Sequence, residues 1–299
     1  MTKKIQKLDG IYPPVPTSFD SDENLSPGSI SENIKYLNRF DLQGYVILGS
    51  NGEYVMLNAR EKIEVFETAR KVIPSKKLMI AGTGCQSTAE TISLNKKAAE
   101  TGADLVLVIT PNYYRSRMDD EAITKHYFLV ADFSPVPVLV YNMPANTGID
   151  LDAETIIKLS RHPNIYGIKD SGGNIIKMAE VIRLADPGFQ VLAGSAGFLL
   201  PALSVGAVGG IMALANLTPD ICISIYDNYL AGDMKKAREL QLKIISLNNA
   251  ITRRWGVAAL KAALDMAGLY GGKVRMPLLP VNNDIKEKLR VLMTEVGIL

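Results

Sequence analysis

Residues 165–173 read IYGIKDSGG, an apolar, β-branched run that ends in a lysine and an aspartate and passes into a glycine-rich turn. Seven more apolar runs recur along the chain, and helix-like segments separate them. We predict eight strands: Ile11–Thr17, Gly44–Leu48, Leu78–Gly82, Leu105–Thr110, Val136–Asn142, Tyr166–Asp170, Gln190–Gly194 and Gly209–Ala213. Strands and helices that alternate every 25–35 residues, roughly, favour βαβ units in a parallel sheet. Eight such units predict an α/β fold in which the sheet closes into a (β/α)8 TIM barrel.

The segments between the predicted strands have helical patterns. In one of them, Asn58 is an N-cap residue with Glu61 three positions later, which is the pattern of a capping box. Pro74 is expected to end this helix, because proline cannot continue one.

The last part of the chain contains no further convincing strand. It reads as two or three helices, for example Met234–Ile251 and Ala258–Leu269, and a final helix after a proline-containing loop. We therefore predict a barrel over residues 1–217 and a C-terminal helical extension, packed on the barrel, over residues 218–299.

Composition excludes several classes of protein. The 299 residues are 47% apolar, which suffices for a large core, and 33 Lys+Arg nearly balance 31 Asp+Glu. This balance offers no electrostatic basis for binding nucleic acid or an anionic membrane. The chain has no apolar run of the roughly 20 residues that a membrane helix needs, and no apolar region of a secretion signal near Met1. Two cysteines, Cys85 and Cys222, and two histidines are too few for a disulfide framework or a usual zinc site. We expect a cytoplasmic protein with no metal and no cofactor.

Lys169 is the strongest candidate for chemistry. Reacting groups in a barrel lie at the C-terminal ends of strands, where Lys169 follows an apolar run. Burial disfavours the charged form of an amine, and a neutral amine can attack a ketone carbon to form an imine. A lysine that reaches solvent, or that pairs with Asp170, explains the same residue without chemistry.

Polar residues at other strand ends can each be explained by a chemical role or by a structural one. The Tyr141 hydroxyl could lie beside Lys169 and shuttle protons, or it could simply find a partner at the barrel rim. Ser50 and Asn51 lie in a glycine-containing loop whose backbone N–H groups could bind a carboxylate, although a tight turn explains them equally well. The loop that begins at Gly194 is ambiguous in the same way.

Three motifs together resemble the dihydrodipicolinate synthase/N-acetylneuraminate lyase family of class I, pyruvate-dependent aldolases. They are Gly49–Glu53, which fits the family pattern G-[ST]-x-G-E, Tyr141–Pro144 and Gly167–Asp170. The resemblance covers nearly the whole chain, from Gly10–Phe19 to Arg275–Leu278. It favours the chemical reading of these strand ends.

The resemblance implies a role for each matching residue. Lys169 would bind pyruvate as a Schiff base, and Tyr141 would shuttle the proton. Ser50 would link Tyr141 to a second tyrosine, Tyr113, which the family supplies from an adjacent subunit, usually within a homotetramer. The backbone at Ile211 matches a position that contacts pyruvate.

Asn146 is a departure that points to one branch of the family. Dihydrodipicolinate synthases typically carry an arginine there, and a neutral amide replaces neither its charge nor its two-pronged geometry. Asn51 also replaces a second hydroxyl residue. With the loops at Ser171 and Gly194, these positions resemble 4-hydroxy-2-oxoglutarate aldolases, which release pyruvate and glyoxylate. By that resemblance Asn51 and Ser171 would hold the distal hydroxyl and carboxylate.

Several functions stay open. The leading one is retro-aldol cleavage of 4-hydroxy-2-oxoglutarate, and another family activity on a 2-keto-3-deoxy acid is an alternative. Dihydrodipicolinate synthase, which condenses pyruvate with aspartate semialdehyde, would need Arg115 or Arg117 to compensate for Asn146. A keto-acid sensor is the non-enzyme alternative, but binding alone does not require both Lys169 and the proton relay of Tyr141.

Overall fold

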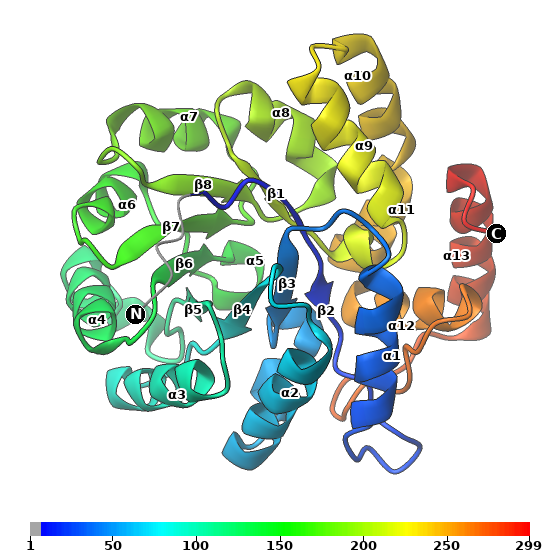
Figure 1. Cartoon of the computed structure of the whole chain (residues 1–299), viewed down its shortest axis with the longest axis horizontal. Coiled ribbons are helices and arrows are strands. Elements are labelled where there is room, and N and C mark those ends of the chain that lie inside the picture. The colour runs from blue at the N-terminus through cyan, green and yellow to red at the C-terminus, as the bar shows by residue number, and fades with distance from the viewer. Residues whose placement is uncertain (1–6) are drawn as a thin grey trace.

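The computed structural model describes residues 7–299, which form a parallel sheet surrounded by helices (Figure 1). The strand order in the sheet is β1-β9-β8-β7-β6-β5-β4-β3-β2. Every neighbouring pair is parallel. The predicted fold class, a (β/α)8 barrel with a helical C-terminal extension, is confirmed.

The first barrel strand has two halves, and these halves close the sheet. β1 (Gly10–Tyr12) pairs with β9 (Gly209–Ile211), and β2 (Pro14–Val15) pairs with β3 (Gly44–Ile47). Pro13 lies between the halves and has no N–H to donate, so the strand is interrupted there. The sequence predicted one uninterrupted strand, and that detail was wrong.

The other predicted strands lie where expected, with ends that differ by at most a few residues. They are β4 (Leu78–Gly82), β5 (Leu105–Ile109), β6 (Val138–Asn142), β7 (Ile165–Asp170) and β8 (Gln190–Ala193). Their residues alternate between two buried sets. Leu105, Leu107 and Ile109 belong to the set inside the barrel, whereas Val106 and Val108 face the surrounding helices.

Helices connect the strands and cover the outside of the barrel (Figure 1). In chain order they are α1 (Pro27–Leu37), α2 (Ala59–Val72), α3 (Thr88–Glu100), α4 (Asp120–Phe133), α6 (Ala153–Ser160), α7 (Ile175–Leu184), α8 (Leu199–Ser204) and α9 (Pro219–Leu230). The predicted capping box of α2 is confirmed, because the Asn58 side chain accepts from the N–H of Glu61 while the Glu61 side chain accepts from the N–H of Asn58.

The helices after α9 lie on the side of the barrel that carries α1 and α9 (Figure 1). The predicted single helix Met234–Ile251 is divided into α10 (Met234–Lys243), α11 (Ile245–Asn249) and a π-helical turn, η6 (Ala250–Arg254). The prediction of one continuous helix was therefore wrong. Two further helices follow, α12 (Gly256–Met266) and α13 (Asn283–Val296). The division of the chain at residue 217 stays a prediction. No helix within residues 7–299 is long and apolar enough to cross a membrane.

Candidate active site

Lys169 and Tyr141 lie next to each other at the ends of β7 and β6. They are register partners in the parallel pair, so both side chains leave the sheet on the same face. Tyr141 belongs to the set of side chains inside the barrel. Both residues are buried, with 3% and 4% of their surfaces exposed, and the Lys169 Nζ lies 4.0 Å from the centroid of the Tyr141 ring. An amine and a phenol thus meet in a region that excludes most water.

Ser50 is a hydrogen-bond partner of the Tyr141 hydroxyl. Its Oγ is 3.1 Å from the Tyr141 Oη, and it begins a 3-10 turn, η1 (Ser50–Gly52), directly after β3. The Thr17 hydroxyl donates to the carbonyl of Gly52 (2.7 Å) and holds the end of this turn against the first barrel strand. The loop after β3 therefore presents its hydroxyl to the residue that ends β6.

The environment of Tyr141 favours its ionised form. Burial raises the pKa of the phenol, but the charge of Lys169 and hydrogen bonds with Ser50, Lys169 and Ser171 outweigh burial and hold the pKa below its ordinary value. A buried tyrosine with a lowered pKa can take up and return a proton during a reaction.

Ser171 and Gly194 bring the ends of β7 and β8 together. The Ser171 hydroxyl donates to the Gly194 carbonyl (3.4 Å), and the Gly194 N–H donates to the carbonyl of Asp170 (2.8 Å). A Cβ at Gly194 would stand 2.7 Å from the Asp170 carbonyl oxygen and 2.8 Å from the Ser171 Cα, so this close approach of two backbones requires glycine. Ile211 ends β9 and is fully buried inside the barrel.

Three predicted site residues lie nearer the surface. Asn51 is half-buried in η1, and Asn146 is exposed in the short helix α5 (Pro144–Thr147). The Tyr113 side chain is 80% exposed and contacts the ring of Tyr114 edge-on, with 5.1 Å between the centroids. Within this chain Tyr113 is therefore not packed into the site, and its predicted role across a subunit contact stays a prediction.

Tyr54 is a site residue that the sequence did not single out. It lines a small cavity together with Ser50 and Tyr141; the other lining residues are Leu48, Gly49, Gly82, Gly84, Leu107 and Ile109. Burial, followed by the proximity of Tyr141 and Cys85, raises the Tyr54 pKa, so this phenol is neutral at physiological pH. Tyr54 directly follows the Gly49–Glu53 motif, and this position in the sequence could have identified it as a candidate site residue. A larger cavity, of about 690 Å³, lies between Phe19 and α13 and contains none of these side chains.

Asp170 does not serve as the partner of Lys169, which was one of the two sequence-based readings. Its carboxylate accepts from the Asn142 Nδ2 (3.1 Å) and from the N–H of Gly172 (2.7 Å), and it lies 3.5 Å from the Nζ of Lys177. Asn142 and Asp170 are register partners, one position after Tyr141 and Lys169. Strand alternation turns their side chains away from the barrel interior. This polar network therefore joins the two strand ends on the outside of the barrel.

A buried ion pair connects the end of the Ser50 turn to the C-terminal extension. Glu53 follows η1 in the left-handed region (φ 50°), and its Oε1 lies 2.5 Å from the Nζ of Lys261 on α12. Each side chain is only 1% exposed. The Lys261 Nζ also donates to the Lys273 carbonyl (2.5 Å), and the other Glu53 oxygen accepts from the N–H of Arg275 (2.9 Å).

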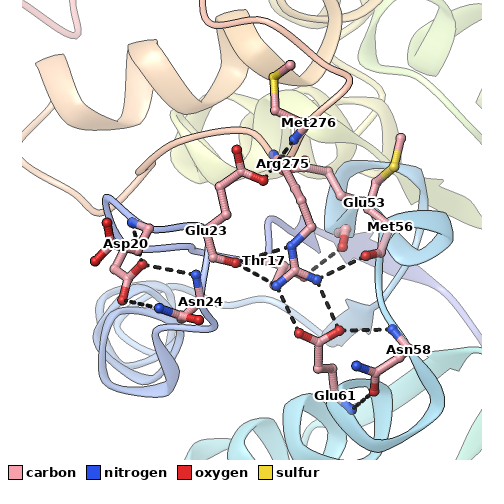
Figure 2. Close-up of polar contacts among 12 residues, drawn as sticks. Thr17, Asp20, Glu23, Asn24, Glu53, Met56, Asn58, Glu61, Arg275 and Met276 are labelled. Carbon is pink, nitrogen blue, oxygen red and sulfur yellow. Dashed lines mark hydrogen bonds and ion pairs between the residues drawn. The ribbon is translucent and has the colours of Figure 1, made fainter.

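Arg275 extends this contact to the start of α2, as Figure 2 shows. Its guanidinium donates to both Glu61 oxygens (2.9 and 3.0 Å), to the Met56 carbonyl and to the Glu23 carbonyl. The Glu61 pKa is lowered chiefly by its hydrogen bond with Arg275, so the carboxylate stays charged. The C-terminal segment is therefore bonded to both ends of the loop that follows β3.

The Dihydrodipicolinate synthetase family model matches residues 7–296 of this chain. A probable mitochondrial 4-hydroxy-2-oxoglutarate aldolase from Emericella nidulans is 35% identical over 96% of this chain and 94% of that protein. A 4-hydroxy-tetrahydrodipicolinate synthase from Methanothrix thermoacetophila is 32% identical over 96% of this chain and 97% of that protein.

Solved structures agree with these sequence matches. The dihydrodipicolinate synthase structure from Bacillus anthracis superposes with a TM-score of 0.93 at 30% identity, covering 97% of this chain and 99% of that one. A family member from E. coli K12, solved in complex with pyruvate, has a TM-score of 0.92 at 28% identity, covering 98% and 99% of the two chains. This chain therefore belongs to the dihydrodipicolinate synthetase family, and it is a class I aldolase or lyase.

Proposed function

We propose that this enzyme cleaves 4-hydroxy-2-oxoglutarate to pyruvate and glyoxylate through a Schiff base on Lys169. The observation that carries the proposal is the buried contact of the Lys169 amine with Tyr141, whose hydroxyl in turn contacts Ser50. The choice of substrate is supported by Asn146, which leaves no arginine at that position, and by the named activity of the Emericella nidulans relative.

The proposed reaction uses the Lys169 amine as the nucleophile and the Tyr141 oxygen as the base. The Lys169 amine adds to the 2-keto carbon, and loss of water leaves an iminium ion. The Tyr141 oxygen takes the proton of the 4-hydroxyl group, the C3–C4 bond breaks, and its electron pair moves toward the iminium nitrogen. Glyoxylate leaves, protonation of the enamine at C3 restores the iminium, and hydrolysis then releases pyruvate and the free amine.

The other predicted site residues support these steps in the proposal. Ser50 connects Tyr141 to Tyr113 of an adjacent subunit in a homotetramer, and the Ile211 backbone contacts the pyruvate half. Asn51 and Ser171 contact the distal half of the substrate. We also propose a reducing, cytoplasmic location, which is supported by the two free, buried cysteines. Light scattering after size-exclusion chromatography tests the tetramer.

Condensation of pyruvate with aspartate semialdehyde is the second candidate. Relatives of similar identity carry the synthase name. In addition, the Arg115 guanidinium lies against Gly148, two residues beyond Asn146, so that a Cβ there would stand 2.5 Å from its Nη1. A cation is therefore available near the position of the missing arginine.

Borohydride trapping tests the proposed function. Wild type and Lys169→Ala are reduced in the presence of pyruvate or of 4-hydroxy-2-oxoglutarate, and the intact protein mass is measured. We expect an adduct of the mass of reduced pyruvate from both ligands in wild type and none in the variant. Parallel assays of pyruvate release and of aspartate semialdehyde consumption separate the two candidates. Folded protein that gives no adduct with either ligand contradicts the Schiff base.

A further inference from the structure

The proposed substrate carries a second carboxylate that needs a binding partner. Asn51 and Ser171 offer only neutral groups to it, and Asn146 is a neutral, exposed side chain. An arginine binds a carboxylate with two parallel, charge-assisted hydrogen bonds, which neutral groups cannot match. A cation near Ser171 would complete the site.

Arg253 approaches the loop that follows Lys169. Its Nη2 lies 3.8 Å from the point where a Cβ on Gly173 would stand, and the ring of Phe198 lies at 3.2 Å from the same point. Gly173 comes two residues after Ser171 and has a positive φ of 77°, which suits glycine. The guanidinium therefore lies beside the C-terminal end of β7, on the edge of the sheet where the Lys169 amine is found.

The segment that precedes Arg253 is hydrogen-bonded to the same end of the barrel. Arg253 belongs to the π-helical turn η6, and such turns occur often at functional sites. One turn earlier, the Asn248 Nδ2 donates to the Ser195 hydroxyl in the loop after β8 (3.1 Å). The Gln241 Nε2 donates to the carbonyl of Ala196 in that loop (2.8 Å). These bonds fix the segment that carries Arg253 against the loops around the site.

The Arg253 side chain is available for a ligand, whereas its neighbour is occupied. Arg253 is exposed and makes no ion pair or side-chain hydrogen bond with any other residue between 7 and 299. The guanidinium of Arg254, on the same turn, lies 4.6 Å from the centroid of the Trp255 ring. The two adjacent arginines therefore have different surroundings and form a matched pair for experiment.

We propose that Arg253 determines specificity by binding the distal carboxylate of the substrate together with Ser171. This inference rests on the proposed function, because it assigns a residue to the second carboxylate of that substrate. Arg115 is the competing cation, but it lies against Gly148, seven residues beyond Tyr141. Gly173, by contrast, is only four residues beyond Lys169, with Ser171 between them.

The test compares two substrates that differ only in the distal group. 4-Hydroxy-2-oxoglutarate carries the carboxylate, and 4-hydroxy-2-oxopentanoate carries a methyl group in its place. In Arg253→Gln we expect kcat/KM for the dicarboxylate to fall about 10- to 100-fold, the effect of losing a charged hydrogen-bonding partner. For the methyl analogue kcat/KM should stay within about threefold of wild type. In Arg254→Gln both values should match those of wild type.

Controls separate this inference from the proposed function. Every arginine variant should still give the borohydride adduct with pyruvate, because that ligand has no distal group. Equal losses of activity on both substrates in Arg253→Gln would overturn the inference, as would a selective loss in Arg115→Gln and not in Arg253→Gln. Pyruvate trapping by a wild-type protein that cleaves neither substrate would leave the Schiff base intact but overturn both the substrate proposal and the role of Arg253.

Discussion

Replacing Lys261 by methionine tests whether the C-terminal extension positions the loop that carries Ser50. Methionine keeps most of the apolar stem but removes the cation that lies 2.5 Å from Glu53. The Glu53 carboxylate would then stay buried, with the N–H of Arg275 as its one remaining hydrogen-bond donor in the described chain. An uncompensated charge at this depth is costly, since both side chains are 1% exposed in the native protein.

The expected loss of unfolding free energy in Lys261→Met is about 3–5 kcal/mol, the usual cost of removing one partner of a buried pair. Changing Glu53 to glutamine as well removes the orphaned charge and keeps an acceptor for Arg275. The double variant should therefore recover most of that loss, because the uncompensated buried charge is the main cost of removing one partner. The order of stabilities, with the single variant lowest, is the result that identifies a charge effect.

Activity should follow the position of Ser50, which lies three residues before Glu53. If the turn loosens, the Ser50–Tyr141 hydrogen bond of 3.1 Å is weakened. We expect kcat to fall about tenfold in Lys261→Met, which corresponds to one hydrogen bond of roughly 1.4 kcal/mol, and to rise again in the double variant.

Urea unfolding and steady-state kinetics measure both effects, and the Arg70–Asp104 pair supplies a control. That pair has 3.3 Å between the charged atoms, both side chains are partly exposed, and Asp104 lies just before β5, at the end of the barrel away from Lys169. Arg70→Met should cost no more than about 1 kcal/mol and leave kcat unchanged. The reasoning fails if Lys261→Met is as stable as Arg70→Met, or if the double variant is no better than the single one.

Three further changes have defined outcomes. Tyr141→Phe should lower kcat by about 10²- to 10⁴-fold, yet still trap pyruvate on Lys169 under borohydride; loss of trapping would mean that Tyr141 is needed before cleavage. Ser50→Ala removes a hydrogen bond that lowers the Tyr141 pKa, so the pKa in the kcat–pH profile should move upward; an unchanged profile counts against the relay. Burial lowers the His126 pKa from 6.5 to about 4, so the unfolded chain binds the proton more tightly and stability falls as the pH drops from 6.5 to 4. The loss should reach about 3 kcal/mol in urea unfolding, and a His126→Gln variant with the same pH dependence would contradict this assignment.

The barrel could be predicted because its strands are buried on both faces. Such strands read as short, nearly continuous apolar runs, and their regular spacing identifies the βα repeat. The break of the first strand at Pro13 was foreseeable in principle. The π-helical turn Ala250–Arg254 was not, because its residues keep a helical apolar pattern and the irregularity accompanies contacts with the loop after β8.

The site was predictable as far as strand ends define it. Lys169, Tyr141 and Ser50 each end or follow a strand, and parallel strands bring such residues together at one edge. Asp170 also ends a strand, but alternation turns its side chain outward to Lys177, so adjacency in sequence suggested the wrong partner.

Contacts between residues that are distant in the sequence could not be predicted from sequence patterns. Glu53 and Lys261 are 208 residues apart, and their pairing is determined by where α12 packs on the barrel. The same holds for Arg253 and Gly173, which belong to different parts of the fold. Sequence patterns report burial and periodicity, but they do not say which distant side chains meet.

These two long-range contacts give the C-terminal extension two separate effects on one site. Lys261 pairs with Glu53 directly after the Ser50 turn. If Ser50 and Tyr141 form the proposed proton relay, loss of Lys261 should lower kcat for every substrate. Arg253 lies beside the loop after β7, so its loss should matter only for a substrate with a distal charge. In the proposed mechanism, the barrel supplies the amine and the phenol, and the extension adds both rigidity and selectivity. Substrate preference in this enzyme could then change through residues 250–254 without any change in the strands that carry the chemistry.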